Sequence, residues 1–372
     1  MNILELCLSA GLGGLELYVF RSNKALANNS NKNNVIPVLR PDSKLDQYYK
    51  NHSSFDIQHI KPFFRALPLL NAKKLAHIID KNKIDVIHMH WGKDLPLAVF
   101  SKLFSKQKPA LVYTRQMMIT RKKDDFYHNF LYRQLDLLLT ITKELEGLCK
   151  KFIPLIADRI TTLYYGVKSP KKFLDKETLI NKRKKLGFTE NDFVAGLIGR
   201  LEQSKGQHLL IEAIHTAKND GLNIKALIVG HEMTLGYRGK LKAQAEKLGV
   251  LNNIIFQDFS SEPQQLMQIC DCVILASAQE TFGLVLPEAM RAGVAVIGSN
   301  SGGVPEIIEH DKTGLLFKPH DTTHLYMMLH QLYDNPNLLS RLAENGKEKA
   351  DSTFNDELHY VTLEALLAKK VP

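Results

Sequence analysis

Two glutamates, Glu280 and Glu288, stand eight positions apart in a segment that could bind a phosphorylated sugar. An apolar run at 272–278 precedes them and is typical of a buried parallel strand, and a short helix is expected at 287–292. A strand that ends in a glycine-containing loop before a helix leaves backbone N–H groups at the edge of a sheet, where phosphates bind. The pattern therefore predicts a nucleotide-sugar pocket. The alternative is a loop glutamate followed by a first-turn glutamate that the helix dipole favours.

In the nucleotide-sugar interpretation, successive parts of this segment bind successive parts of the ligand. Backbone amides meet the phosphates, Glu288 accepts hydrogen bonds from the ribose diol, and Glu280 accepts them from the sugar. The residues expected to bind the donor here are Glu280, Thr281, Phe282, Gly283, Leu284 and Glu288.

Two cations, Arg200 and Lys205, lie between an apolar run at 193–199 and a helix expected at 206–218. Arginine can make forked contacts to a phosphate, whereas lysine supplies a point charge. Two cations near a helix start would neutralise a diphosphate leaving group. The alternative is a pair of solvated basic side chains.

These motifs resemble the retaining nucleotide-sugar glycosyltransferases of family 4. The resemblance rests on Glu280-x7-Glu288 with its internal Phe-Gly and following Glu-Ala-Met, and on Gly199-Arg200 followed by Lys205-Gly206, which is close to the diphosphate motif of that family. It is best over 193–317, weaker but continuous over 1–166, and thin near the end of the chain. The resemblance implies an α/β protein of the GT-B type, with two Rossmann-like domains facing across a cleft.

The same resemblance implies a division of labour along the chain. Residues 1–168 would form an acceptor-binding domain, 169–352 would form a donor-binding domain, and a last helix within 353–372 would cross back to the first domain. A linker is expected near 166–175, where the rhythm of strands and helices breaks.

Residue roles follow from the resemblance. Arg200, Lys205 and Glu280 would be catalytic: the two cations stabilise the departing diphosphate, and the glutamate orients the sugar. Transfer with retention would take place on the face that the leaving group occupies, and the departing phosphate would help to deprotonate the acceptor. No metal is expected, since no Asp-x-Asp motif occurs. Further donor contacts are expected from Gly13 and Gly14 near the phosphates and sugar, and from Asp258 and Phe259 near the nucleobase.

The acceptor side is expected in the first domain. His88 and His90 share one face of a strand, which suggests either a lining of the cleft or a packed structural role, because no third ligand for zinc is apparent. Gln116 stands where relatives usually have a histidine. Arg115 and Arg121 would belong to a basic rim, beside a helix that starts near Phe126 and could face lipid.

Strand-like apolar runs alternate with amphipathic helical segments along the whole chain, which predicts parallel sheets. A capping box at 261–264 predicts a helix start there, and 28–34 reads as a polar loop. The other strands are expected at 3–8, 35–39, 85–90, 110–114, 137–142, 160–163, 224–230, 254–257 and 294–299, and the other main helices at 69–81, 95–105, 238–248, 322–333, 336–350 and 355–370.

Charge is spread unevenly. Residues 1–168 carry 26 Lys and Arg against 14 Asp and Glu, whereas 169–372 carry 23 against 25. A basic first half suggests a surface that meets anions such as phospholipid head groups, an acidic glycan or a lipid diphosphate. The start of the chain lacks the features of a signal peptide, and the four cysteines fit reduced thiols. We therefore expect a cytoplasmic protein, peripheral at the inner face of the membrane.

The sequence thus predicts a retaining glycosyltransferase that needs no metal. It would move a sugar from a nucleotide diphosphate sugar to a glycan or lipid-linked acceptor, in surface polysaccharide or lipopolysaccharide biosynthesis, and no nucleic-acid partner is expected. Two alternatives remain open: a sugar-nucleotide epimerase on the same scaffold, and a non-catalytic protein that binds glycan or nucleic acid.

Overall fold

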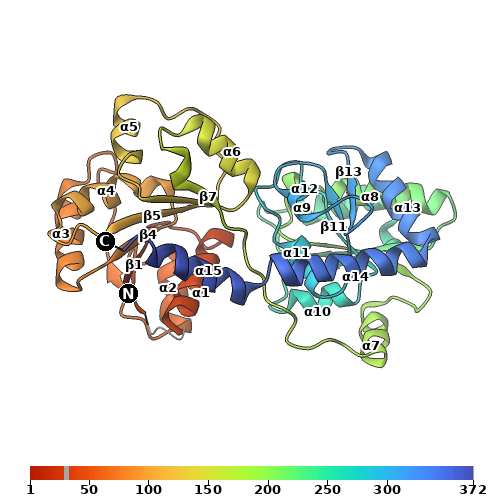
Figure 1. The fold of residues 1–372 in the computed structure, drawn as a ribbon. Coiled ribbons are helices and arrows are strands. Elements are labelled where there is room, and N and C mark those ends of the chain that lie inside the picture. The colour runs from red at the N-terminus through yellow and green to blue at the C-terminus, as the bar shows by residue number, and fades with distance from the viewer. Residues whose placement is uncertain (29–32, 372) are drawn as a thin grey trace. The chain divides into compact units, whose positions relative to one another are not determined.

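A computed structural model describes residues 1–28 and 33–371 (Figure 1). The predicted polar loop over 28–34 falls largely outside the described residues. The chain divides into two compact units, one made of residues 1–164 and 357–372 and the other of residues 165–356. These divisions lie a few residues from the boundaries expected after 168 and 352, and the roles assigned to the two domains remain predictions.

The first unit is built on a parallel seven-stranded sheet in the order β3-β2-β1-β4-β5-β6-β7. Its strands are β1 (Asn2–Cys7), β2 (Asn34–Leu39), β3 (Gln58–His59), β4 (Val86–Met89), β5 (Ala110–Arg115), β6 (Leu137–Thr140) and β7 (Ile160–Thr162). Its helices are α1 (Gly14–Asn28), α2 (Lys44–His52), α3 (Leu69–Lys81), α4 (Leu95–Phe104), α5 (Phe126–Tyr132), α6 (Lys143–Phe152) and α15 (Asp356–Ala368).

The second unit contains a parallel six-stranded sheet in the order β10-β9-β8-β11-β12-β13. The strands are β8 (Phe193–Ile198), β9 (Ile224–Val229), β10 (Ile254–Gln257), β11 (Cys272–Leu275), β12 (Ala295–Ser299) and β13 (Leu315–Phe317). The helices are α7 (Lys176–Leu186), α8 (Gln207–Asn219), α9 (Tyr237–Lys247), α10 (Pro263–Gln268), α11 (Val285–Arg291), α12 (Val304–Ile307), α13 (Thr322–Asp334) and α14 (Pro336–Thr353).

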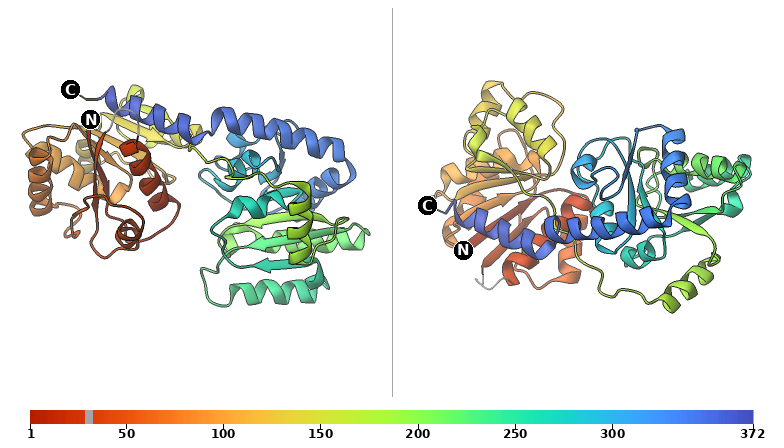
Figure 2. Two further views of the ribbon diagram at one scale, coloured as in Figure 1. Left: turned by 90° about the horizontal axis from the view of Figure 1, so that it is seen from below. Right: turned by 45° about the vertical axis from the view of Figure 1, so that its right-hand side comes forward.

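Both sheets are doubly wound, with helices on their two faces (Figure 2). The strand order reverses direction between β1 and β4 in the first sheet, and between β8 and β11 in the second. Loops that leave two such strands run to opposite faces, so a crevice opens outside their carboxyl ends, and ligands of this fold bind there. The topology thus marks one candidate site in each unit. The expected α/β class with two Rossmann-like domains is confirmed.

Some local expectations need correction. The helix start predicted at 261–264 is confirmed, since α10 begins at Pro263, but the capping box itself does not form, because the residue before the helix is Glu262 and its side chain makes no capping hydrogen bond. β3 and β13 were not expected, since two and three residues are too few to show a strand pattern.

Helix α15 packs in the first unit, where His359 shares a hydrogen bond of 3.0 Å with the hydroxyl of Tyr18 in α1.

Within 1–28 and 33–371, none of the helices combines the length and the apolar character that a membrane span requires.

Candidate active site

The loop between β8 and α8 carries Arg200 and Lys205 at the switch point of the second sheet. Two backbone features hold it there: the amide of Leu201 donates to the carbonyl of His231 at 2.9 Å, and Gly206 has a positive φ of 73°. A Cβ on Gly206 would lie 2.2 Å from the carbonyl oxygen of Ala276, so only glycine allows this close approach. The loop is thereby pressed against the carboxyl end of β11, from which Glu280 follows.

The cation and the acid that the sequence singled out form a direct pair. The ammonium of Lys205 lies 2.7 Å from the carboxylate of Glu280, and each side chain is 21% exposed. Arg200 is half exposed and pairs with Glu202 at 3.1 Å. The structure thus brings Lys205 and Glu280 together, with Arg200 on the same loop, and all three side chains are at least partly exposed to solvent.

The backbone of Glu280 is supported by the turn after β12. Its carbonyl accepts a hydrogen bond from the amide of Gly303 at 3.0 Å. Gly302 approaches so closely that a Cβ would lie 2.0 Å from the same carbonyl oxygen, and its φ of 59° also favours glycine. Ser301 adds a hydrogen bond from its hydroxyl to the carbonyl of Ala278 at 2.9 Å. The Ser-Gly-Gly turn therefore positions Glu280 through contacts with the backbone.

The Thr281–Glu288 stretch enters helix α11, which begins at Val285, earlier than predicted. Phe282 is buried and packs edge-on against Tyr165 and Phe354, so its ring is not available to a ligand. Thr281, Leu284 and Glu288 are partly exposed, and Glu288 lies in the first turn of the helix.

The far end of α11 is tied to the rest of the unit by a residue that the sequence did not single out. Arg291 pairs with Asp351 of α14 at 2.8 Å and donates to the carbonyl of Val167. Because Arg291 is buried, this anchor fixes the helix that carries Glu288.

Asp258 and Phe259 follow β10 at the same sheet edge. Asp258 pairs with Arg238 at 2.5 Å, and the same guanidinium donates to the carbonyl of Gly230 at 2.7 Å. Phe259 is 70% exposed and stands edge-on to His231. An exposed aromatic ring beside fixed polar groups could stack on a flat ligand such as a nucleobase. Arg238 was missed because the sequence placed it only inside an amphipathic helix.

In the first unit, the glycine-rich loop after β1 differs from what was expected. The amide of Gly13 donates to the carboxylate of Glu16 at 2.8 Å, and the hydroxyl of Ser9 donates to the other oxygen at 2.5 Å. The acid of α1 thus occupies the place that an anion would take over this loop. Contacts from Gly13 to a donor phosphate would first require that carboxylate to move, and Gly14, which begins α1, remains a predicted donor contact.

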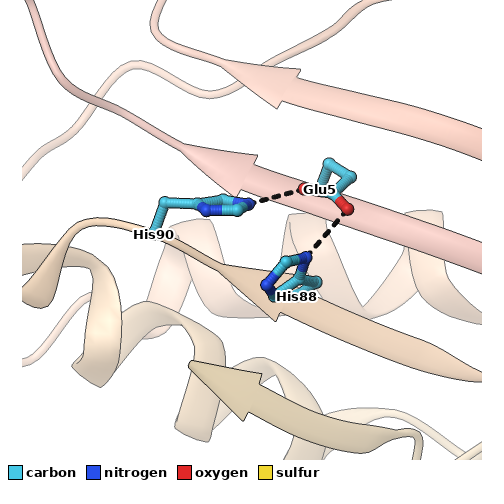
Figure 3. Close-up of side chains that lie close together, drawn as sticks. All are labelled: Glu5, His88 and His90. Atoms are coloured by element: carbon cyan, nitrogen blue, oxygen red, sulfur yellow. Dashed lines mark hydrogen bonds and ion pairs between the residues drawn. The ribbon is translucent and has the colours of Figure 1, made fainter. Parts of the chain in front are cut away.

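His88 and His90 meet Glu5 of the neighbouring strand β1, as Figure 3 shows. One carboxylate oxygen lies 2.9 Å from Nδ1 of His88, and the other lies 2.6 Å from Nε2 of His90. His88 also contacts the hydroxyl of Thr114 at 2.7 Å. Glu5 is thus a potential third zinc ligand, which was not apparent from the sequence. The signal was an acid inside an apolar strand, because a buried carboxylate needs partners.

Electrostatics identify this cluster as a hydrogen-bonded network. Burial opposes ionisation of Glu5, but the charges and hydrogen bonds of His88 and His90 outweigh it and lower its pKa to about 2. Burial, with the neighbouring His88, lowers the pKa of His90 to about 4. Ligand atoms around a tetrahedral zinc ion lie about 3.3 Å apart, farther than these direct contacts. The two imidazole N–H groups thus solvate the carboxylate, and the geometry favours a structural role.

The remaining residues of the expected acceptor set are Arg115, Gln116 and Arg121. Arg115 is the buried last residue of β5 and donates to the carbonyl of Met118 at 3.2 Å, so it does not belong to a basic rim. Gln116 is buried beside it, whereas Arg121 is exposed. Together with the buried His88 and His90, these positions leave Arg121 as the only residue of the expected acceptor set that the structure presents to solvent.

Comparison with known proteins agrees with this geometry. The family model described as glycosyltransferase family 4 matches residues 12–169, and the model for glycosyl transferases group 1 matches residues 180–349. Together they span both units.

Individual relatives and solved structures are similar over nearly the full chain. An uncharacterized glycosyltransferase of Methanocaldococcus jannaschii is 26% identical over 91% of this chain and 89% of its own length. The capsular polysaccharide biosynthesis glycosyltransferase CapM of Staphylococcus aureus is 22% identical over 90% of each chain. The crystal structure of Anabaena HepE in complex with UDP-glucose matches with a TM-score of 0.80 and 23% identity, over 99% of this chain and 100% of the other.

The switch-point site with its paired cation and acid, the two Rossmann-like units and these matches lead to one conclusion: the chain belongs to the glycosyltransferases of family 4, retaining enzymes of the GT-B fold that transfer a sugar from a nucleotide-sugar donor.

Proposed function

We propose that this enzyme transfers a sugar from a UDP-sugar to a glycan or lipid-linked acceptor during the synthesis of a surface polysaccharide or lipopolysaccharide. The observation that carries the proposal is the Lys205–Glu280 pair beside Arg200 at the switch point of the second sheet. The name of the Staphylococcus aureus relative and the UDP-glucose bound to the Anabaena protein support the choice of pathway and donor.

The chemistry assigned to this site is one displacement with retention. As the bond between the anomeric carbon and the diphosphate breaks, its electron pair passes to the phosphate oxygen, where Arg200 and Lys205 stabilise the growing negative charge. The acceptor hydroxyl bonds to the same face of the sugar, and its proton passes to the departing phosphate. Glu280 exchanges its bond to Lys205 for sugar hydroxyls.

The remaining donor contacts surround this centre. Glu288 accepts hydrogen bonds from the ribose diol, and the backbone of Phe282, Gly283 and Leu284 faces the phosphates. Phe259 stacks on the base, with Asp258 and Arg238 fixing its edge. Thr281 completes the loop wall.

We propose that no metal is required, because Arg200 and Lys205 supply the positive charge that a divalent ion would otherwise bring to a diphosphate. Turnover in excess EDTA equal to turnover with added Mg²⁺ is the expected result. A loss of activity that only a divalent ion restores would contradict this assignment.

A screen of nucleotide sugars tests the donor assignment. Ligands that bind only the folded state raise the melting temperature, so UDP-sugars should give larger shifts than GDP- or ADP-sugars. The Arg200→Ala, Lys205→Ala double variant should lose the shift. Equal shifts in the double variant would overturn the site, and an isomerised nucleotide sugar formed without acceptor would point to an epimerase.

We further propose that the enzyme is cytoplasmic and binds the anionic inner face of the membrane through its first unit. Large apolar side chains are exposed at Phe63, Phe64, Leu67 and Leu70, and at Phe126, the first residue of α5, which is 90% exposed. The hydroxyl of Tyr127 donates to the carbonyl of Ala66, so the two segments lie side by side. We call this set of five apolar residues the apolar patch.

Basic residues flank the apolar patch, which matches an anionic lipid surface in charge as well as in polarity. The flanking cations are Lys61, Lys73, Lys74, Arg121, Lys122 and Lys123. Co-sedimentation with phosphatidylglycerol vesicles should exceed that with phosphatidylcholine vesicles. Phe63→Ser, Leu70→Ser should reduce it, whereas Phe104→Ser, Ile156→Ser should not, although these control residues are also exposed apolar side chains of the same unit. An equal loss of vesicle binding in both double variants would contradict the assignment of the apolar patch as the membrane-binding surface.

A further inference from the structure

A pocket lies at the switch point of the first sheet, where β1 and β4 end. Leu8 follows β1, Lys93 and Asp94 follow β4, and the segment that contains Phe63 and Arg65 also lines the pocket. In doubly wound sheets the crevice outside the carboxyl ends of such strands is where ligands bind. None of the residues assigned to the donor lines this pocket.

Two cations converge there on one aromatic ring. The guanidinium of Arg65 lies 4.5 Å from the ring centre of Trp91, and the ammonium of Lys93 lies 5.2 Å from it. Trp91 lies two residues after the end of β4 and is partly exposed. Cation–π contacts of this kind hold the two positive groups close together, although like charges repel each other.

The guanidinium also has an unmet donor. Its Nη1 atom is buried and finds no hydrogen-bond partner among the described residues, because the nearest carboxylate oxygen, on Asp94, is 3.7 Å away. The other oxygen of Asp94 accepts from the backbone amide of Leu8 at 2.8 Å, which fixes the carboxylate in place. Leaving a buried donor without an acceptor is unfavourable, so an oxyanion in the pocket would remove a penalty.

The charges and apolar side chains that line this pocket determine which class of ligand fits it. It holds two cations against one acid, and its walls include the apolar side chains of Leu8, Phe63 and Leu97. Phe63 also belongs to the apolar patch, so a molecule bound here by an anionic group could extend towards a lipid surface.

We propose that this pocket binds a phosphate or carboxylate group of the acceptor, held by Arg65 and Lys93 against Trp91. The proposal rests on the proposed transferase function and adds to it the chemical class of the acceptor. The anionic group could be the phosphate of a lipid-linked acceptor or the carboxylate of an acidic sugar, and both would meet the same two cations.

Trp91 allows a direct test, because it is the only tryptophan in the chain and both cations of the pocket contact its ring. The protein would be titrated with inorganic phosphate, with glucuronate and with neutral methyl glucoside at constant ionic strength. We expect a saturable change with one or both anions and none with the neutral sugar. A response to phosphate alone would identify a phosphorylated acceptor, and a response to glucuronate alone would identify an acidic sugar.

Matched variants complete the test. Arg65→Gln should weaken anion binding about tenfold, the equivalent of one charge-assisted hydrogen bond, and Lys93→Gln should also weaken it. Lys81→Gln, at an exposed lysine of α3, should leave binding unchanged. No response to either anion, or the same affinity in all variants, would overturn the proposal. Melting-temperature shifts with UDP, measured on the same variants, should stay intact, so failure here is distinguishable from failure of the donor site.

Discussion

The ammonium of Lys205 lies 2.7 Å from the carboxylate of Glu280, and the two residues come from loops on either side of the switch point of the second sheet. This ion pair joins the loop after β8 to the loop after β11. A sugar diphosphate that binds between these loops would separate the pair, since each partner is assigned a different part of the ligand.

Replacing Lys205 with alanine should lower turnover by about 10²-fold or more, because one donor to the departing diphosphate is lost. Lys247→Ala, which removes an exposed lysine at the end of α9, is the matched control and should be active. Release of UDP from the donor is the measurement. Turnover of Lys205→Ala within twofold of the control variant would contradict the assigned role.

Phe259→Ser should weaken binding of the donor about tenfold, because stacking of a base on an aromatic ring contributes about 1–3 kcal/mol. The matched control is Met327→Ser, which removes a half-exposed apolar side chain from helix α13 of the same unit. Calorimetric titration with UDP measures both. If Phe259→Ser binds UDP as tightly as the control does, the base lies elsewhere.

Glu5→Gln should destabilise the first unit by about 2 kcal/mol, because the amide cannot accept from both imidazoles and buries an unmatched donor. Urea unfolding followed by Trp91 emission reports on this unit. EDTA should leave the unfolding curve of the wild-type protein unchanged if the network holds no metal. A large loss of stability with EDTA, restored by zinc, would instead identify Glu5, His88 and His90 as a metal site.

His359 should make the docking of α15 depend on pH. Its Nδ1 lies 2.6 Å from the carbonyl of Tyr164, and burial lowers its pKa to about 4. Since the pKa in the folded state lies below the unfolded value of about 6.5, the unfolded state binds more protons between these pH values. The contribution of His359 to stability is therefore complete above pH ~6.5 and is lost as the pH falls towards 4.

Between pH 7 and pH 5 this loss should amount to about 2 kcal/mol, at about 1.4 kcal/mol per pKa unit. His359→Gln should show a correspondingly smaller decrease in its unfolding free energy over the same interval. Identical pH dependence in both proteins would show that this imidazole is not buried as a neutral group.

The sequence predicted most of the fold because its elements carry strong local patterns. Helix α3 was expected at 69–81 and has those bounds, since its apolar residues recur at helical spacing. β3 and β13 escaped prediction because they are too short to show a pattern. The helix start at 261–264 was predicted correctly, because proline is common at the first position of a helix, whereas the capping box of the same motif did not form.

Parts of the candidate site that depend on contacts between distant segments could not be predicted. The Glu5 network joins residues 83 and 85 positions apart, and only the strand order makes them neighbours. The same holds for Arg65 and Trp91, whose stacking depends on how one loop folds over the sheet edge. Lys205 and Glu280 were chosen individually from their motifs, but their direct pairing emerged only from the topology of β8 and β11.

A crystal structure of the enzyme with UDP tests the central claim most directly. The account predicts that the diphosphate lies within hydrogen-bond distance of Arg200 and Lys205, that Glu288 contacts the ribose, and that the bond between Lys205 and Glu280 has opened. A diphosphate bound elsewhere, with that ion pair intact and Arg200 directed to solvent, would contradict it.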